Sequence, residues 1–95
     1  MIYSEDSEER RSEILQLSIE DIQLTVRSYN ALKRAGINTL ADLVERSKDV
    51  EAFVRIINFG KASRVEVAAK MLHHGLIDES HPVTSMIGYS GMKNS

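Results

Sequence analysis

Apolar residues recur every three or four positions along most of this chain, which is the spacing of helices with one buried face. From Thr25 onward the pattern predicts a helix that buries Leu32 and Ala35, while Asn30 and Lys33 lie on another face. No stretch shows the alternation of a strand. The pattern therefore predicts an all-α fold, a compact bundle of four to five short helices.

Glycines and capping residues mark where these helices begin and end. Gly36 and Gly75 each follow a helical stretch, and each is predicted to supply the left-handed residue that ends a helix. Thr39, with Asp42 three residues later, predicts a capping box at the start of the next helix. Further helical segments are expected at 18–22, at 48–57 and from about 62 to 74.

Composition divides the sequence into three parts. The first part is rich in Ser, Glu and Asp without apolar periodicity, as in flexible segments. The last part holds the only proline, although Met86, Ile87 and Tyr89 could dock on the body. The predicted parts are an acidic flexible leader (1–14), a helical domain (15–77) and a flexible tail (78–95).

The net charge of −2 conceals an uneven distribution. Residues 1–21 carry seven acidic and two basic side chains, whereas residues 22–75 carry nine basic and five acidic ones. The body is thus mildly basic, which makes polyanions reasonable partners beside the simpler interpretation of an ordinary solvated surface. No apolar run approaches the ~20 residues of a membrane span, and the start lacks signal-peptide character, so a cytoplasmic protein without membrane contact is expected.

The sequence contains no motif that supports a catalytic, metal or cofactor site. The chain has no cysteine, and its GKAS stretch lacks both the earlier glycine and the Ser or Thr after lysine that a phosphate-binding loop needs. His73 and His74 are adjacent, so they cannot form a ligand pair on one helix face. The leader's carboxylates sit on a segment expected to be too mobile for acid–base work. A non-enzymatic protein without a cofactor is therefore predicted.

Two turns share a design typical of helix-hairpin-helix modules. LKRAGINT and IINFGKAS each run from apolar residues through a glycine to a residue that opens the next helix. Free N–H groups at such helix starts can bind phosphate oxygens without reading bases, and the side chains of Lys61 and Ser63 are placed to add contacts. The alternative, that these turns only pack helices, is equally compatible with the spacing.

The stretch VRSYNALKRAGINTLADL, followed by NFGKAS, resembles the C-terminal domain of the bacterial RNA polymerase alpha subunit over roughly residues 17–76. The resemblance implies a compact helical domain that binds A·T-rich promoter DNA through the minor groove and contacts transcription activators and the sigma factor. Tyr29 is expected to pack, and Ala62 stands where the family usually has a second basic residue. The implied DNA-binding residues are Arg27, Asn30, Gly60, Lys61, Ser63 and Glu66.

Three functional hypotheses follow. The first is a transcription-related DNA-binding module that uses Arg27 in the minor groove and the turn at 60–63 on the phosphates. The second is a protein-interaction domain that keeps the fold and binds a regulator, the sigma factor or itself, supported by a second apolar stripe on the last helix through Ala68 and Leu72. The third is that the acidic leader folds back on the basic face and competes with DNA.

Overall fold

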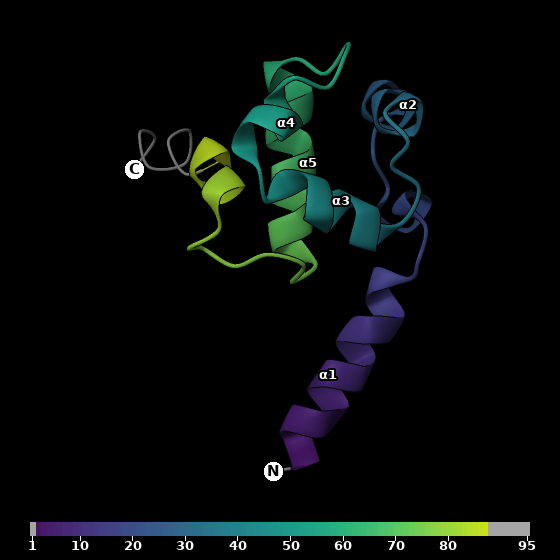
Figure 1. The fold of residues 1–95 in the computed structure, drawn as a ribbon, viewed down its shortest axis with the longest axis vertical. Helices are drawn as coiled ribbons and strands as arrows, with labels where there is room; N and C mark the ends of the chain where they lie inside the picture. Colours follow the sequence, from purple (N-terminus) through teal and green to yellow (C-terminus); the bar gives the residue numbers. More distant parts are fainter. Residues whose placement is uncertain (1, 88–95) are drawn as a thin grey trace.

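Helices account for all the regular elements of the part of the chain that the structure describes, which confirms the all-α prediction. The structure, a computed structural model, describes residues 2–87. Its elements, in sequence order, are α1 (Ile2–Leu15), the 3-10 helix η1 (Ile19–Ile22), α2 (Val26–Arg34), α3 (Leu40–Ser47), α4 (Val50–Val54), α5 (Lys61–His73) and the 3-10 helix η2 (Pro82–Thr84) (Figure 1). In this described part, no helix is long and apolar enough to cross a membrane.

The bounds of α2 follow from its flanking residues. Thr25 is the N-cap, and its hydroxyl accepts a hydrogen bond from the Ser28 N–H. After the last turn Gly36 takes a φ of 84°, and the Ile37 N–H donates to the Leu32 carbonyl at 2.9 Å. This is the glycine-dependent helix end that the sequence predicted, because a left-handed residue lets the backbone reverse under its own last turn.

The α3 and α4 helices form the next hairpin. Thr39 and Asp42 make the predicted capping box, with both hydrogen bonds at 3.1 Å, and the N–H groups of Asn38 and Thr39 lower the pKa of the Asp42 carboxyl. α4 is shorter than predicted and ends at Val54. The backbone then tightens, because the Ile56 N–H bonds to the Phe53 carbonyl three residues back instead of four.

The core lies between α5 and the other helices of the body. Val67, Ala68 and Met71 of α5 are fully buried, and Phe53 packs edge to face against Phe59 with ring centroids 5.2 Å apart. Leu72 is half-buried and packs against this core. Both apolar stripes of α5 are therefore at least partly covered, which removes much of the sequence argument for an uncovered face on that helix.

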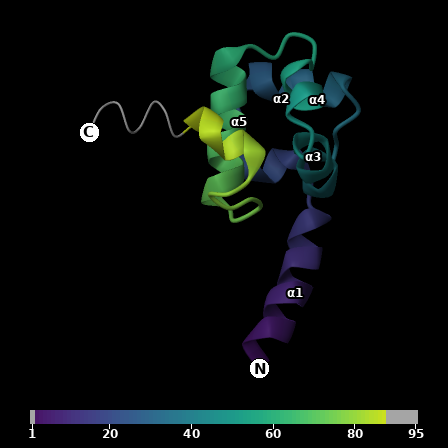
Figure 2. The same ribbon diagram turned by 60° about the vertical axis from the view of Figure 1, so that its left-hand side comes forward.

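The acidic leader forms a helix where its composition predicted a segment without regular structure. α1 extends away from the body in both views (Figures 1 and 2), and its C-terminal half makes the contacts described next. Ile14 and Leu15 pack against the core, and the Arg11 guanidinium donates to the carbonyls of Gly75 and Leu76 at 3.2 and 3.1 Å. Composition missed this helix because α1 has no apolar stripe of its own; these few contacts at one end attach it to the body.

The first half of the predicted tail packs on the body. η2 lies against α5, with Val83 fully buried, and Met86 and Ile87 pack on the core. Tyr89 lies outside the described residues. The apolar side chains between residues 78 and 87 are too sparse to show a helical period. For that reason the sequence predicted a flexible tail and gave packing of this segment on the body only as an alternative.

Candidate nucleic-acid interface

The outer face of α2 carries two of the predicted DNA-binding residues. Arg27 and Asn30 are exposed and lie three positions apart, so they point to the same side of the helix. Tyr29 behaves as predicted: it is half-buried against the core, and its hydroxyl donates to Glu20 at 2.9 Å, which raises the Tyr29 pKa. Because Tyr29 packs, the polar side chains of α2 that point into solvent are others, Arg27 and Asn30 among them.

Glu66 of α5 holds the start of α2 in place. Its carboxylate accepts hydrogen bonds from the Thr25 N–H at 2.7 Å, from the Thr25 hydroxyl at 2.8 Å and from the buried Ser28 hydroxyl at 2.5 Å. Burial raises the pKa of this carboxyl, but the hydrogen bonds from Ser28 and Thr25, with the charge of Lys70, outweigh it and leave the pKa lowered. Glu66 therefore stays ionised and joins α5 to the helix that carries Arg27.

In the turn before α5, no side chain caps the backbone N–H groups at the start of the helix. Asn58 adopts a left-handed φ of 61°, and Gly60 is the N-cap of α5 and has no side chain to provide a capping hydrogen bond. The first hydrogen bond of the helix is donated by Arg64 to Gly60, which leaves the N–H groups of the first three residues without an intrahelical partner. Such donors, together with the positive end of the helix dipole, favour an anion.

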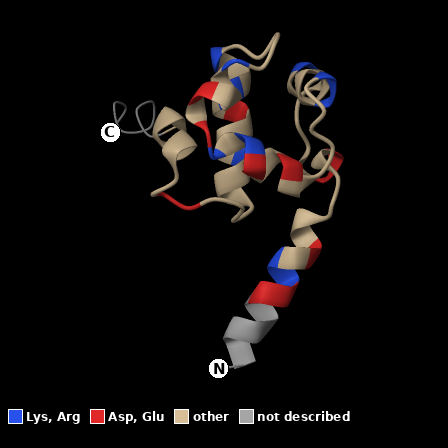
Figure 3. Cartoon of the chain, in the orientation of Figure 1, with Lys and Arg blue, Asp and Glu red and all other residues tan. Residues whose placement is uncertain are grey.

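These two elements face each other across an open groove, which we call the α2 groove. Its volume is about 580 Å³, and it is lined by Val26, Arg27, Asn30, Ala31, Arg34, Asn58 and Gly60. Basic side chains gather on α2 and at the start of α5, on either side of it (Figure 3). An open groove flanked by basic side chains suits a polyanion better than a small apolar ligand.

The structure brings together some of the predicted site residues and separates others. Arg27, Asn30 and Gly60 line the α2 groove, and Lys61 is exposed beside it at the first position of α5. Ser63 is buried, with 5% of its surface exposed, and Glu66 bonds to α2 instead of lining the groove. The six predicted residues are therefore neighbours, but only four of them face solvent at the groove.

Two polar residues of the groove, Arg34 and Asn58, were not among those predicted. Asn58 belongs to the NFGK turn, and its left-handed backbone is a conformation that Asn adopts more readily than most residues. Arg34 lies seven positions after Arg27, which is two helical turns and the same face. That spacing was a signal available in the sequence, although it gains meaning only once the groove is known to run along α2.

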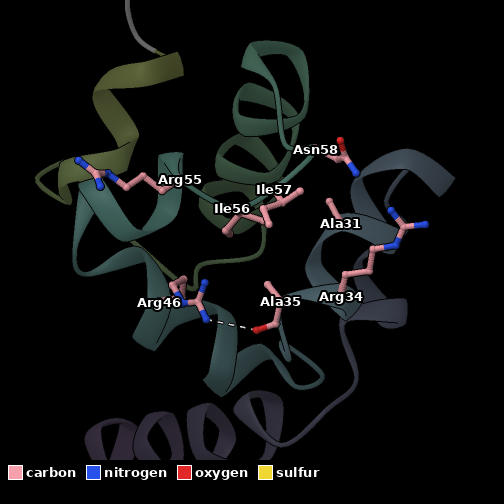
Figure 4. Close-up of a pocket in the computed structure, with 8 residues that line it drawn as sticks. All are labelled: Ala31, Arg34, Ala35, Arg46, Arg55, Ile56, Ile57 and Asn58. Atoms are coloured by element: carbon pink, nitrogen blue, oxygen red, sulfur yellow. Dashed lines mark hydrogen bonds between the residues drawn. The ribbon is translucent and has the colours of Figure 1, made fainter.

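A second hollow, which we call the arginine recess, adjoins the α2 groove. It holds about 310 Å³ between α2 and the segment that follows α4. Residues that line it include Arg34, Arg46 and Arg55, while Ala35, Ile56 and Ile57 supply apolar walls (Figure 4). Ala31, Arg34 and Asn58 line both hollows, so groove and recess form one continuous surface. Among the side chains that the structure describes, no group of three metal-ligating residues occurs.

Comparison with known proteins identifies a family for this chain. Residues 5–73 match the family of the C-terminal domain of the bacterial RNA polymerase alpha subunit. The chain is 49% identical over 72 residues to the DNA-directed RNA polymerase subunit alpha of Moorella thermoacetica, and 44% identical over 75 residues to that of Symbiobacterium thermophilum. These alignments include 76% and 79% of this chain but 22% and 23% of the relatives, so the chain spans less than a quarter of their length.

Proposed function

Because the chain belongs to the family of C-terminal domains of the bacterial RNA polymerase alpha subunit, we propose that it is a DNA-binding module of transcription. It contacts A·T-rich promoter DNA in the minor groove and makes further contacts with transcription activators or the sigma factor. The module itself performs no chemistry. Its role is to hold DNA and regulators near a polymerase.

The observation that carries this proposal is that Arg27, Asn30 and Gly60, the N-cap of α5, line the same groove. A narrow A·T minor groove has an enhanced negative potential, which attracts an inserted guanidinium group. The free N–H groups after Gly60, with Lys61 beside them, suit the backbone phosphates next to that groove. Glu66 supports both contacts as a positioning residue, since it joins the helix that carries Arg27 to the helix that begins at Lys61.

Replacing Arg27 with Ala tests the minor-groove contact. We expect the variant to lose its preference for an A·T-rich duplex over a G·C-rich duplex of equal length, by roughly the 1–3 kcal/mol typical of an arginine contact to DNA. The measurement is a fluorescence anisotropy titration of both duplexes at fixed salt. Affinities in the range of about 10⁻⁴ to 10⁻⁶ M are expected for so small a contact surface.

Arg10→Ala is the matched control, because Arg10 is an exposed arginine on α1 away from the groove. It removes the same charge and should leave the A·T preference unchanged. Equal urea midpoints for both variants would show that the fold is intact. An A·T preference that survives Arg27→Ala, or that falls equally with Arg10→Ala, would contradict the minor-groove role.

The alternative function, a domain that binds a regulator or another copy of itself with little affinity for DNA, is favoured by one observation. Val26 and Ile57 are 74% and 75% exposed on the two sides of the hollowed surface. Exposed aliphatic side chains of this size suit a protein partner. Sedimentation at increasing concentration tests the self-association form: a mass that rises with concentration supports it, and a constant monomer mass speaks against it.

A further inference from the structure

Within residues 2–87, Arg34 makes no hydrogen bond or ion pair with another protein group, unlike most arginines of the body. Of the five arginines between residues 22 and 75, three are engaged within the described part of the chain. Arg46 donates to the Ala35 carbonyl at 3.2 Å, Arg55 pairs with Glu51 at 3.2 Å, and Arg64 donates to the Phe59 carbonyl at 3.3 Å. Arg27 and Arg34 have no such partner there, and both line the α2 groove.

The position of Arg34 continues the line that begins at Arg27. Seven residues of helix advance about 10 Å along the axis, and two turns return to the same face. Arg34 also lines the arginine recess, so it stands where groove and recess join. Figure 4 shows its side chain extending from α2 toward the side of the recess on which Asn58 lies, whereas Arg55 points away from it.

We propose that Arg34 is a further DNA contact of this protein, one that binds a backbone phosphate beside the minor groove that Arg27 enters. This inference rests on the proposed function. Phosphates of one strand follow each other at about 3.4 Å along the duplex axis, so a guanidinium about 10 Å from Arg27 reaches a phosphate about three nucleotides away. The contact would offset the missing basic side chain at Ala62, on the opposite side of the groove.

A guanidinium in the last turn of α2 also suits the negative end of the helix dipole, which gives Arg34 a purely structural reason to be present. The two roles differ in what they predict for DNA. A phosphate contact adds affinity for every sequence and adds to the salt dependence, whereas a helix-dipole contact affects only the stability of the fold.

Arg34→Ala and Arg34→Lys, titrated with the A·T-rich and G·C-rich duplexes between 50 and 200 mM salt, test the proposal. We expect Arg34→Ala to weaken the binding of both duplexes alike. The slope of log affinity against log salt concentration should become shallower by about 0.9, the value for one phosphate. Across that salt range the affinity of the variant should therefore fall about three- to fourfold less than that of the unmodified protein. Arg34→Lys should restore most of the slope, and the A·T preference should remain in both variants.

Arg55→Ala is the matched control, since Arg55 lines the same recess but is paired with Glu51. Duplexes in which a single phosphate is replaced by an uncharged methylphosphonate locate the contact. At one position the replacement should lower the affinity of the unmodified protein for DNA and leave the affinity of Arg34→Ala unchanged. An unchanged salt slope in Arg34→Ala, or the same change of slope in Arg55→Ala, would overturn the role of Arg34. The proposed function would still stand if Arg27→Ala reduced the A·T preference. Failure of the unmodified protein to bind either duplex would overturn both.

Discussion

At the scale of single residues, Glu66 connects the two sides of the candidate interface. One carboxylate satisfies the Thr25 N–H, the Thr25 hydroxyl and the buried Ser28 hydroxyl. Hydrogen bonds to a charged partner contribute more than neutral ones, and a buried hydroxyl left without a partner costs further free energy. The start of α2, and with it the direction of Arg27, therefore depends on a residue of a different helix that is distant in the sequence.

Replacing Glu66 with Ala should lower the free energy of unfolding by about 1.5–3 kcal/mol, since hydrogen bonds to a charged group are lost and the buried Ser28 hydroxyl loses the acceptor of its own hydrogen bond. Because the pKa of Glu66 is lowered in the folded state, its contribution is complete above the unfolded pKa of about 4.3. The contribution is lost as the pH falls through the lower folded pKa. Urea unfolding between pH 7 and pH 3 should show the difference between the two proteins shrinking toward low pH.

Glu45→Ala is the control, because Glu45 forms only an exposed pair with Lys48 at 3.2 Å. Such a pair contributes little, so its removal should leave stability nearly unchanged over the same pH range. A Glu66→Ala difference that stayed constant from pH 7 to pH 3 would show that the ionised carboxylate is not what stabilises the start of α2.

The sequence could predict which residues surround the interface but not what each one does. Arg27 and Asn30 share a helix face by spacing alone, so their exposure together was predictable. Glu66 was predicted as a DNA contact, yet its three hydrogen bonds reach residues on another helix, and no local pattern reveals a pairing across such a sequence distance. Arg34 shares the face of Arg27 by spacing, but its place where groove and recess join depends on the turn at Asn58, which is distant in the sequence.

At the scale of elements, the start of α5 has a glycine that the fold does not require. Gly60 has a φ of −81°, which any residue adopts, and a Cβ added there would meet nothing within 4 Å. Neither strain nor packing requires a glycine here, although glycine is an accepted N-cap residue. The close approach of DNA to this backbone that we propose would account for it.

Gly60→Ala should therefore weaken binding of the A·T-rich duplex while changing stability by no more than about 1 kcal/mol, the usual scale of an N-cap substitution. The contrasting variant is Gly36→Ala, where the φ of 84° disfavours a side chain. That variant should lose stability and keep its affinity for DNA as long as it is folded. Anisotropy titrations with parallel urea unfolding check both, and unchanged DNA affinity in Gly60→Ala would argue against backbone contacts at this turn.

The α1 helix bears on the hypothesis that the acidic leader competes with DNA. Arg11 fixes the end of α1 to the carbonyls of Gly75 and Leu76, after the C-terminal end of α5, whereas the α2 groove lies at the start of α5. The helix would have to leave this position, or bend, to cover the groove. Competition by the leader stays a hypothesis, and removal of residues 1–12 should tighten DNA binding at low salt if it is correct.

At the scale of the whole molecule, the extent of the folded unit is open to a direct test. The predicted domain ends at residue 77, but Val83 is fully buried against the body and Thr84 nearly so. A protein that ends at Ile77 should be less stable than one that ends at Ile87 by about 1.5–3 kcal/mol, the contribution of burying one aliphatic side chain. Comparing the urea midpoints of the two proteins decides between the boundaries, and equal midpoints would support the boundary at 77.

The architecture as a whole was predictable because most of it is encoded locally. Thr39 with Asp42, and the glycines at 36 and 75, set helix ends through contacts within a few residues. The elements that were missed or misjudged are α1 and η2, which are held by contacts with distant parts of the sequence, through Arg11 and Val83. Helical period and capping patterns report on local geometry, so they contain no signal for either attachment.

The direction of α1 also has a consequence for valency. A helix of 14 residues is about 21 Å long, and in both views α1 leaves the body away from the start of α5, whose N-cap Gly60 lines the α2 groove. Two copies joined through the N-terminal ends of α1 would therefore present their grooves outward, each free to bind DNA. A site that is weak in isolation would gain avidity of up to about 10²–10⁴ on a duplex that carries two suitably spaced A·T tracts, without a single new contact.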